Sequence, residues 1–155
     1  MADEFNLLLR SGSFTTNPRK RIHKINNPKN SSLPELSFQL PVAYEGPEGE
    51  NKEKVYTPEH YFLAAISGCF FTTFSVVCSN SNFNYTNLEI ESKGYVGTST
   101  GVKMMEKIEQ KITLTIPSSL REKKARRILE IAENRCPLAK SIKTRLINIY
   151  NILTE

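Results

Sequence analysis

The sequence predicts an α+β domain in which strands pack with long helices. Residues 57–78 begin with helix-capping signals and then become uncharged and mostly apolar, which indicates a long helix. Residues 88–96 and 108–116 alternate apolar and polar side chains, the period of half-buried strands in an antiparallel sheet. Residues 120–132 repeat apolar side chains at helical spacing, and an apolar run at 146–153 favours a last strand.

The length of 155 residues is typical of one domain, so we expect residues 1–155 to form a single domain. Hydrophobic residues make up 39% and charged residues 24%, which is ordinary for a soluble globular protein. The first residues carry acids and lack a long apolar run, so they do not predict a signal peptide. Three cysteines, an odd number, do not suit a disulfide framework. Together these features favour a cytoplasmic protein whose thiols stay reduced.

The first 45 residues contain short strand-like segments separated by turn residues. We interpret these segments as an antiparallel meander. They are residues 5–9, 14–16, 22–25 and 36–40. Residues 44–54 then form a polar loop that contains glycine and proline and leads into the long helix.

The long helix is predicted to begin with Thr57 as its N-cap and Pro58 as its first residue. Proline suits this position because the N–H that it lacks would have no hydrogen-bond partner within the helix. The helix dipole favours the carboxylate of Glu59 in the first turn. Large apolar side chains fall on every face of residues 61–78, so we expect the helix to be buried. This uncharged run approaches the length of a membrane span. Its Ser and Thr residues, and the lack of flanking basic clusters, instead favour a helix inside a soluble domain or dimer.

The second half of the chain predicts a hairpin, two helices and a strand. Residues 97–107 connect the two alternating strands as a hairpin. Ser119, with Glu122 three residues later, fits a capping box for the next helix. Cys136 and Pro137 are expected to start a short third helix, and residues 146–153 form the last strand.

Two basic clusters, residues 19–24 and 121–127, occur in a chain of net charge +5. Such clusters can bind the phosphates of nucleic acids. The second cluster falls on a helix whose polar face needs charge in any case, and no nucleic-acid-binding motif accompanies either cluster. The pattern therefore favours a solvated surface over nucleic-acid binding.

The three cysteines differ in their predicted settings. Cys78 lies nine residues after Cys69, about 180° round a helix, so these two cannot pair and Cys78 is expected to pack. Cys136, at a predicted helix start beside Arg135, is the better candidate for a thiol of low pKa, although a packed N-cap cysteine fits equally well. For Cys69 the default is a buried, inert cysteine, because desolvation raises the pKa of a thiol.

The sequence predicts no metal site and no bound cofactor. The two histidines, His23 and His60, stand apart, and neither Cys-x-x-Cys nor His-x-x-x-His spacing occurs. The sequence also lacks a phosphate-binding glycine loop and a nucleophile-elbow motif.

Two segments resemble a known family. TPEHYFLAAISGC, residues 57–69, is similar to the helix start that leads from Pro-Glu to a cysteine in the OsmC/Ohr family of osmotically induced and organic hydroperoxide resistance proteins. CPLAKSIK, residues 136–143, is similar to the second cysteine motif of that family. The resemblance covers residues 36–153 and is weaker over residues 1–35.

The resemblance implies antiparallel sheets wrapped around long central helices in an intertwined homodimer. It also implies a thiol peroxidase that reduces organic hydroperoxides in oxidative-stress defence. Cys69 would be the peroxidatic thiol, oxidised to a sulfenic acid, and Cys136 the resolving thiol that condenses with it. An external dithiol, of the lipoyl type in the better-known members, would reduce the disulfide. The apolar neighbours Ile66, Phe70 and Phe71 would suit an organic peroxide.

The resemblance further implies a charged partner for the thiol. Glu59 matches the family glutamate that helps to hold an arginine beside the thiolate. Ten residues of helix span about 15 Å, so Glu59 approaches Cys69 only through a broken helix or through a partner subunit. The arginine candidates are Arg10, Arg19 and Arg21. The alternative function is that of an OsmC-like protein without peroxidase activity, which binds a small apolar or thiol ligand at the dimer interface.

Overall fold

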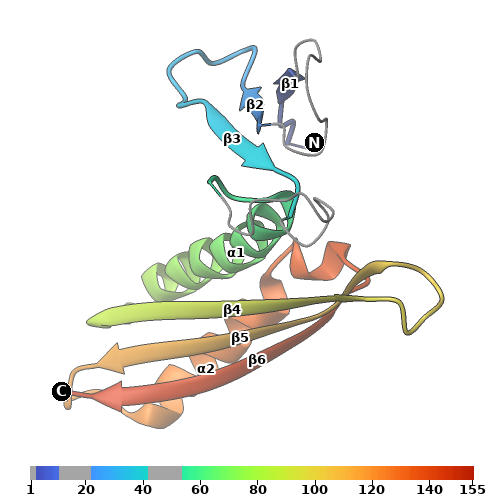
Figure 1. The fold of residues 1–155 in the computed structure, drawn as a ribbon. Helices are drawn as coiled ribbons and strands as arrows, with labels where there is room; N and C mark the ends of the chain where they lie inside the picture. The colour runs from blue at the N-terminus through green and yellow to red at the C-terminus, as the bar shows by residue number, and fades with distance from the viewer. Residues whose placement is uncertain (1–2, 11–21, 42–53) are drawn as a thin grey trace. The chain divides into compact units, whose positions relative to one another are not determined.

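The computed structural model describes residues 3–10, 22–41 and 54–155 (Figure 1). It divides into two compact units, Met1–Tyr61 and Phe62–Glu155, so the assignment of one domain stays a prediction. The predicted strand at residues 14–16, the candidates Arg19 and Arg21, and nearly all of the predicted loop at residues 44–54 lie outside the described residues.

The N-terminal unit contains a three-stranded sheet in the order β1-β2-β3. Its strands are β1 (Leu8–Arg10), β2 (Ile22–Asn26) and β3 (Leu36–Gln39). Both pairings are antiparallel, with Leu9 opposite Ile25. The described part of this unit therefore confirms the predicted meander.

Hydrogen bonds connect β3 to the segment that precedes the long helix. Gln39 is 5% exposed, and its side-chain oxygen accepts N–H groups from Lys54 at 2.9 Å and Val55 at 3.1 Å. The Tyr61 hydroxyl donates to the carbonyl oxygen of Ser37 at 2.6 Å. These contacts anchor the first turn of the helix to the sheet of its own unit.

The long helix α1 (Pro58–Asn80) starts and ends as its sequence dictates. The backbone N–H of His60 donates to Thr57 Oγ1 at 3.3 Å, which confirms Thr57 as the N-cap. At the other end Asn82 takes a left-handed φ of 48°, a conformation that asparagine tolerates. The Phe83 N–H then reaches back to the carbonyl oxygen of Cys78 at 2.9 Å and closes the helix end.

Only one face of α1 is buried, which corrects the expectation of a helix buried all round. Val76 is 59% exposed and Phe71 is 44% exposed. By length and composition α1 is also the one helix among the described residues that meets the criteria for a membrane span. That is weak evidence, because core helices of soluble proteins meet the same criteria. The buried residues of α1 are Ile66, Phe70, Phe74, Val77 and Cys78.

The C-terminal unit contains a second sheet in the order β4-β5-β6. Strands β4 (Asn87–Gly97) and β5 (Met104–Ile116) form the predicted antiparallel hairpin. Strand β6 (Arg145–Thr154) pairs with β5 in parallel, which the strand pattern did not indicate. Helix α2 (Glu122–Arg135) and the short 3₁₀ turn η3 (Ala139–Ser141) form the crossover connection that parallel pairing requires.

The start of α2 differs from the sequence prediction. Arg121 is the N-cap and makes no side-chain capping bond, so the capping box at Ser119 is wrong. The N–H of Leu120 instead donates to the carbonyl oxygen of Pro117 at 2.9 Å. This turn follows β5 and delays the helix until Glu122.

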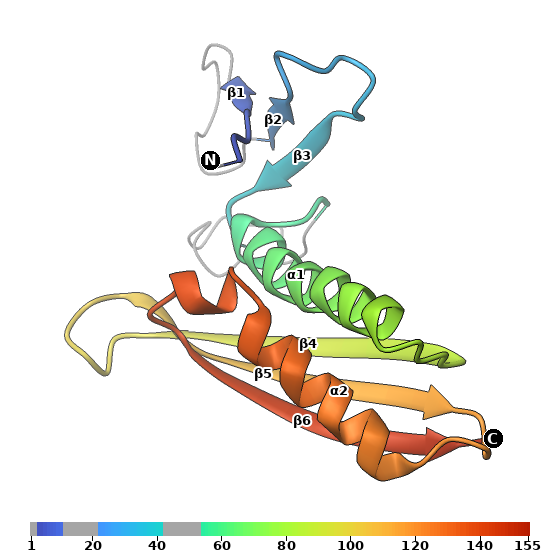
Figure 2. The ribbon, with the colours of Figure 1, turned by 180° about the vertical axis from the view of Figure 1, so that it is seen from behind.

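Helices α1 and α2 lie on the same face of the β4-β5-β6 sheet in the C-terminal unit (Figure 2). The two helices and the sheet share one apolar core. This packing of helices on a sheet confirms the predicted α+β class. Its buried members include Phe70, Phe74 and Val77 of α1, Ile112, Leu114 and Ile116 of β5, and Ala125, Ile128, Leu129 and Ala132 of α2. Both helices are thus fixed to one sheet, and with them the cysteines that they position.

Candidate active site

The structure brings Cys69 and Cys136 together, although 67 residues separate them in the sequence. The two sulfur atoms lie 3.0 Å apart, with the Cys136 thiol donating a hydrogen bond to Cys69 Sγ. A disulfide bond would require about 2.05 Å, and both cysteines are free thiols. The pair is therefore a reduced dithiol in which the two sulfurs already touch.

Cys136 ends α2 and does not begin a third helix, which corrects the sequence prediction. As the C-cap it has φ −67° and ψ 110°. The cause is Pro137, because the residue before a proline is pushed out of the helical region into an extended conformation. Only the short turn η3 follows, at Ala139–Ser141.

The thiol of Cys136 is held in its protonated form. Burial, and next the hydrogen bond with Cys69, raise the pKa of Cys136 to about 11. The backbone N–H groups of Ala139 and Leu138 act in the opposite direction but do not outweigh burial. The prediction that Cys136 has a low pKa is therefore wrong, and its thiol remains a donor at neutral pH.

The two sulfurs differ in their access to solvent. Cys69 is partly exposed, whereas Cys136 is 1% exposed. A molecule that arrives from solvent therefore meets Cys69 first. Of the predicted apolar neighbours, Ile66 and Phe70 are buried, and only Phe71 is exposed.

Cys78 takes no part in this pair. It is 5% exposed and belongs to the apolar core between α1, α2 and the sheet. Burial raises its pKa to about 11. These observations agree with the predicted packing role.

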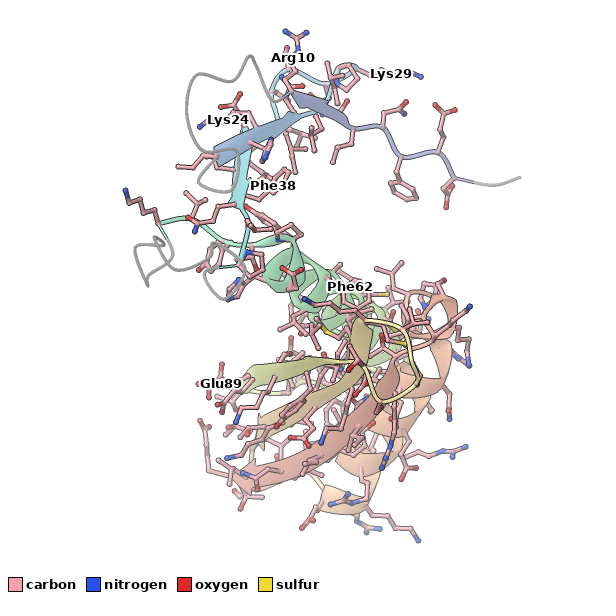
Figure 3. All side chains as sticks on the ribbon, turned by 45° about the vertical axis from the view of Figure 1, so that its right-hand side comes forward. Arg10, Lys24, Lys29, Phe38, Phe62 and Glu89 are labelled. Atoms are coloured by element: carbon pink, nitrogen blue, oxygen red, sulfur yellow. The ribbon has the colours of Figure 1, made fainter. Side chains whose placement is uncertain are left out.

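Of the charged residues predicted to support the thiol, the structure describes Glu59 and Arg10. Helix α1 runs unbroken from Pro58 to Asn80, which excludes the broken helix as a route for Glu59 to reach Cys69. Glu59 Oε2 is buried and has no hydrogen-bond partner within the described residues. Arg10 is exposed on β1, and its guanidinium extends away from the strand (Figure 3). The roles of Glu59 and of the candidate arginines stay predictions.

The histidines make structural contacts. His60 Nδ1 lies 2.7 Å from Thr57 Oγ1 at the start of α1. His23 stacks on Phe38 with ring centroids 5.0 Å apart. Within the described ranges, no group of three His, Cys, Asp or Glu side chains is arranged to hold a metal ion.

Sequence reasoning missed a polar row in the sheet beneath the two helices. Ser92, Gln110 and Asn148 lie side by side on β4, β5 and β6. Gln110 is fully buried on the face of β5 that also carries Ile108 and Ile112. A polar residue at an apolar position of an alternating strand was the available signal, and it became visible only with the strand register.

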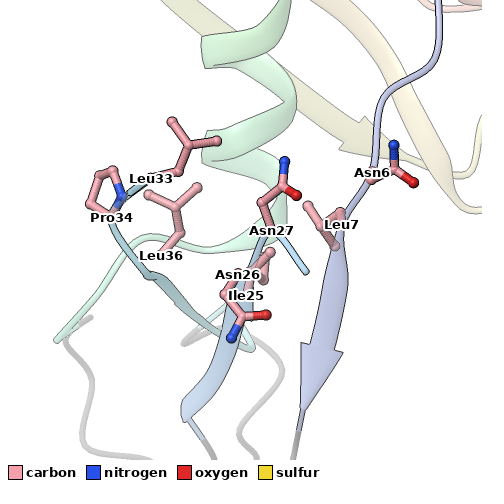
Figure 4. Close-up of a pocket in the computed structure, with 8 residues that line it drawn as sticks. All are labelled: Asn6, Leu7, Ile25, Asn26, Asn27, Leu33, Pro34 and Leu36. Carbon is pink, nitrogen blue, oxygen red and sulfur yellow. The ribbon is translucent and has the colours of Figure 1, made fainter. Parts of the chain in front are cut away.

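A hollow of about 290 Å³ lies in the N-terminal unit, where β1 and β3 begin and β2 ends (Figure 4). All of its lining residues are uncharged, and most of its lining surface is apolar. The hollow therefore offers no acid, base or nucleophile for chemistry. Its lining consists of Asn6, Leu7, Ile25, Asn26, Asn27, Leu33, Pro34 and Leu36.

Comparison with known proteins agrees with the resemblance in the sequence. The family profile described as OsmC-like protein matches residues 49–149. None of the curated proteins compared matches the chain.

Several solved structures share the fold. An OsmC-like protein of unknown function from Vibrio cholerae is 16% identical, with a TM-score of 0.78 over 96% of this chain and 99% of that chain. An organic hydroperoxide resistance protein from Elizabethkingia anophelis is 17% identical, with a TM-score of 0.69 over 100% of both chains. Another from Bacillus subtilis is 17% identical, with a TM-score of 0.59 over 96% and 98%. At these identities the similarity shows the fold.

Proposed function

The chain belongs to the OsmC-like protein family, and from that premise we propose that it is a thiol peroxidase that reduces organic hydroperoxides. The observation that carries the proposal is the dithiol of Cys69 and Cys136, with its sulfurs 3.0 Å apart. One thiol is accessible and the other is buried. A cysteine peroxidase with an internal resolving thiol needs this asymmetry, because the peroxide must reach one sulfur and the second must wait beside it.

The reaction begins at Cys69. Its thiolate attacks the terminal oxygen of the hydroperoxide, so an S–O bond forms while the O–O bond breaks. The alkoxide takes up a proton and leaves as the alcohol, and Cys69 becomes a sulfenic acid, oxidised by two electrons.

Cys136 resolves the sulfenic acid. Its sulfur attacks Cys69 Sγ, an S–S bond forms, and the hydroxyl group leaves as water with the proton of Cys136. An external dithiol then reduces the disulfide by giving up two electrons and two protons, and itself becomes a disulfide. A lipoyl-type dithiol fits this role, and no bound cofactor is required.

We also propose that the active form is a cytoplasmic homodimer. The exposed side of α1 carries the apolar side chains of Phe71 and Val76, which are 44% and 59% exposed, and a second copy of the chain would bury them. Among the described residues the buried Oε2 of Glu59 has no hydrogen-bond partner, which supports the expected arginine, since a guanidinium is the usual partner of such a carboxylate. That cation would favour the thiolate of Cys69.

Treatment with cumene hydroperoxide tests the proposed function. We expect one equivalent of peroxide to produce a Cys69–Cys136 disulfide, detected by peptide mass spectrometry without reduction. The variant Cys78→Ser is the matched control and should form the same disulfide, because Cys78 lies in the core. If both thiols stay reduced in the wild-type protein, the peroxidase is excluded and the ligand-binding alternative takes its place.

A further inference from the structure

A row of polar side chains crosses the sheet of the C-terminal unit among apolar rows. In the strand register Ser92 pairs with Gln110, and Gln110 pairs with Asn148. Gln110 is 0% exposed, and burying an amide is unfavourable unless its polar atoms are hydrogen-bonded. The rows on either side along the same face are Gly94, Ile108 and Leu146, and Ile90, Ile112 and Tyr150.

Hydrogen bonds continue this row into both helices. The Ser67 hydroxyl on α1 donates to Gln110 Oε1 at 2.9 Å. Gln110 Nε2 donates to Asn148 Oδ1 at 2.8 Å. Asn148 Nδ2 donates to Glu133 Oε1 on α2 at 3.0 Å. One chain of three hydrogen bonds thus connects α1, β5, β6 and α2.

The orientation of both amides in this chain is determined by its end at Glu133. An ionised carboxylate can only accept, and its other oxygen accepts the Tyr150 hydroxyl at 2.6 Å. Burial, and next the contact with Glu133, raise the pKa of Tyr150, so the hydroxyl keeps its proton. Asn148 must therefore turn its amide nitrogen to Glu133, and Gln110 must turn its own to Asn148. The Gln110 oxygen is then left to accept from the serine hydroxyls, Ser67 at 2.9 Å and Ser92 at 3.5 Å. Each amide therefore has its polar atoms hydrogen-bonded, which is the condition for a polar network that specifies one packing.

The two ends of the chain lie close to the two reactive cysteines in sequence. Ser67 precedes Cys69 by two residues on α1, and Glu133 precedes Cys136 by three residues on α2. Apolar contacts between helix and sheet are not directional, whereas hydrogen bonds are sensitive to distance and angle. The hydrogen bonds therefore set the position of each helix along the sheet more narrowly than the apolar core does.

We propose that Gln110 is a positioning residue, whose hydrogen-bond chain from Ser67 to Glu133 holds Cys69 and Cys136 at reaction distance. This inference rests on the proposed function only for the identity of the oxidant, a peroxide. Disulfide formation requires a narrow S–S geometry whatever the oxidant, so a small shift of α1 against α2 slows it and weakens the disulfide.

The test uses the full chain in glutathione redox buffers at equilibrium. One molecule of oxidised glutathione converts the two thiols to the disulfide and becomes two molecules of reduced glutathione. The equilibrium constant of this exchange has the unit of a concentration, and it is the effective concentration of the two thiols. In Gln110→Leu, which keeps the approximate size but removes the amide, we expect this concentration to fall by about 10- to 100-fold. An unchanged value would overturn the proposal. Because no peroxide is used, the result is independent of the cumene hydroperoxide experiment.

Further variants separate positioning from general loss of stability. Ser67→Ala removes one end of the chain in a milder way and should lower the effective concentration, whereas Ser67→Thr keeps the hydroxyl and should stay close to wild type. In Ser67→Ala/Gln110→Leu the value should be no lower than in Gln110→Leu alone, because both changes break the same chain.

Leu114→Ala is the control for stability, because Leu114 is fully buried on the same strand and belongs to the apolar core. We expect it to unfold at lower urea concentration while the effective concentration of the dithiol stays within twofold of wild type. If Leu114→Ala lowers the effective concentration as much as Gln110→Leu, loss of stability explains both and the positioning role is overturned.

Discussion

Each unit of the chain buries one glutamine, and the surroundings of the two glutamines differ. Gln39 lies in a unit where the buried residues, among those described, are itself and Thr57, while Ile22 and Leu36 are more than 40% exposed. Gln110 lies among isoleucines that are fully buried. The C-terminal unit therefore supplies its own core and positions both thiols. The N-terminal unit relies on hydrogen bonds and leaves apolar side chains exposed.

The largest expected effect is on the rate of peroxide reduction, and substitutions in the two units should lower this rate by different factors. Cys69→Ser should lower peroxide reduction by at least about 1,000-fold, because it removes the nucleophile. Glu59→Gln, in the N-terminal unit, should lower it by about 10- to 100-fold, because the expected arginine loses its partner. Steady-state turnover of cumene hydroperoxide with a dithiol measures both. Full activity of Glu59→Gln would show that the N-terminal unit gives the thiol no electrostatic support.

The next effect concerns stability. Phe74→Ala removes a ring that is 0% exposed in the C-terminal core and should cost about 3–5 kcal/mol of unfolding free energy. Leu36→Ala removes a side chain that is 44% exposed on β3 and should cost less than about 1 kcal/mol. Urea unfolding followed by circular dichroism measures both. Equal losses at the two positions would contradict the contrast between the units.

The exposed face of α1 gives a smaller effect that appears in the association of chains. Phe71→Glu places a charge on this face and should weaken a dimer by more than about 10-fold in its dissociation constant. Val102→Glu, at a position 64% exposed in the β4–β5 loop, is the matched control and should leave association unchanged. Sedimentation velocity over a range of concentrations measures both. A wild-type chain that stays monomeric throughout would exclude a second copy on this face.

The smallest effect is a pH dependence that belongs to the C-terminal unit alone. Burial raises the pKa of Cys78 from 9.0 to about 11, and the pKa of Cys136 rises to about 11 as well. The folded state thus holds protons that the unfolded state releases, so stability is complete below pH 9 and falls as pH rises towards 11. Urea midpoints measured between pH 8 and 11 should decline less in Cys78→Ala than in wild type. Equal declines would show that the Cys78 thiol does not contribute.

Most of the fold could be predicted from the sequence, because its elements are long and strongly periodic. The β4–β5 hairpin, both helices and β6 follow from local patterns. The parallel pairing of β6 does not, since alternation along a strand says which face is buried and nothing about the direction of its neighbour. The prediction that α1 is buried on every face was wrong for a related reason. Apolar side chains on a helix predict burial, but they do not say whether residues of the same chain bury them.

The candidate site was predictable as a pair of cysteines but not as a chemical arrangement. The family motifs around Cys69 and Cys136 indicated the pair, and the sulfurs do meet. Reasoning from residue types alone gave the low pKa to Cys136, because Cys-Pro was interpreted as a helix start where it is a helix end. Gln110 could not be recognised, because its partners Ser92 and Asn148 come from strands whose register only the structure reveals.

The parallel pairing of β6 with β5 also has a consequence for biosynthesis. During translation the β4–β5 hairpin can form from neighbouring residues, but β6 can join the sheet only after the whole α2 crossover has left the ribosome. Asn148, which connects Gln110 to Glu133, arrives with β6. We therefore expect the two thiols of the nascent chain to reach their 3.0 Å separation only after β6 has docked.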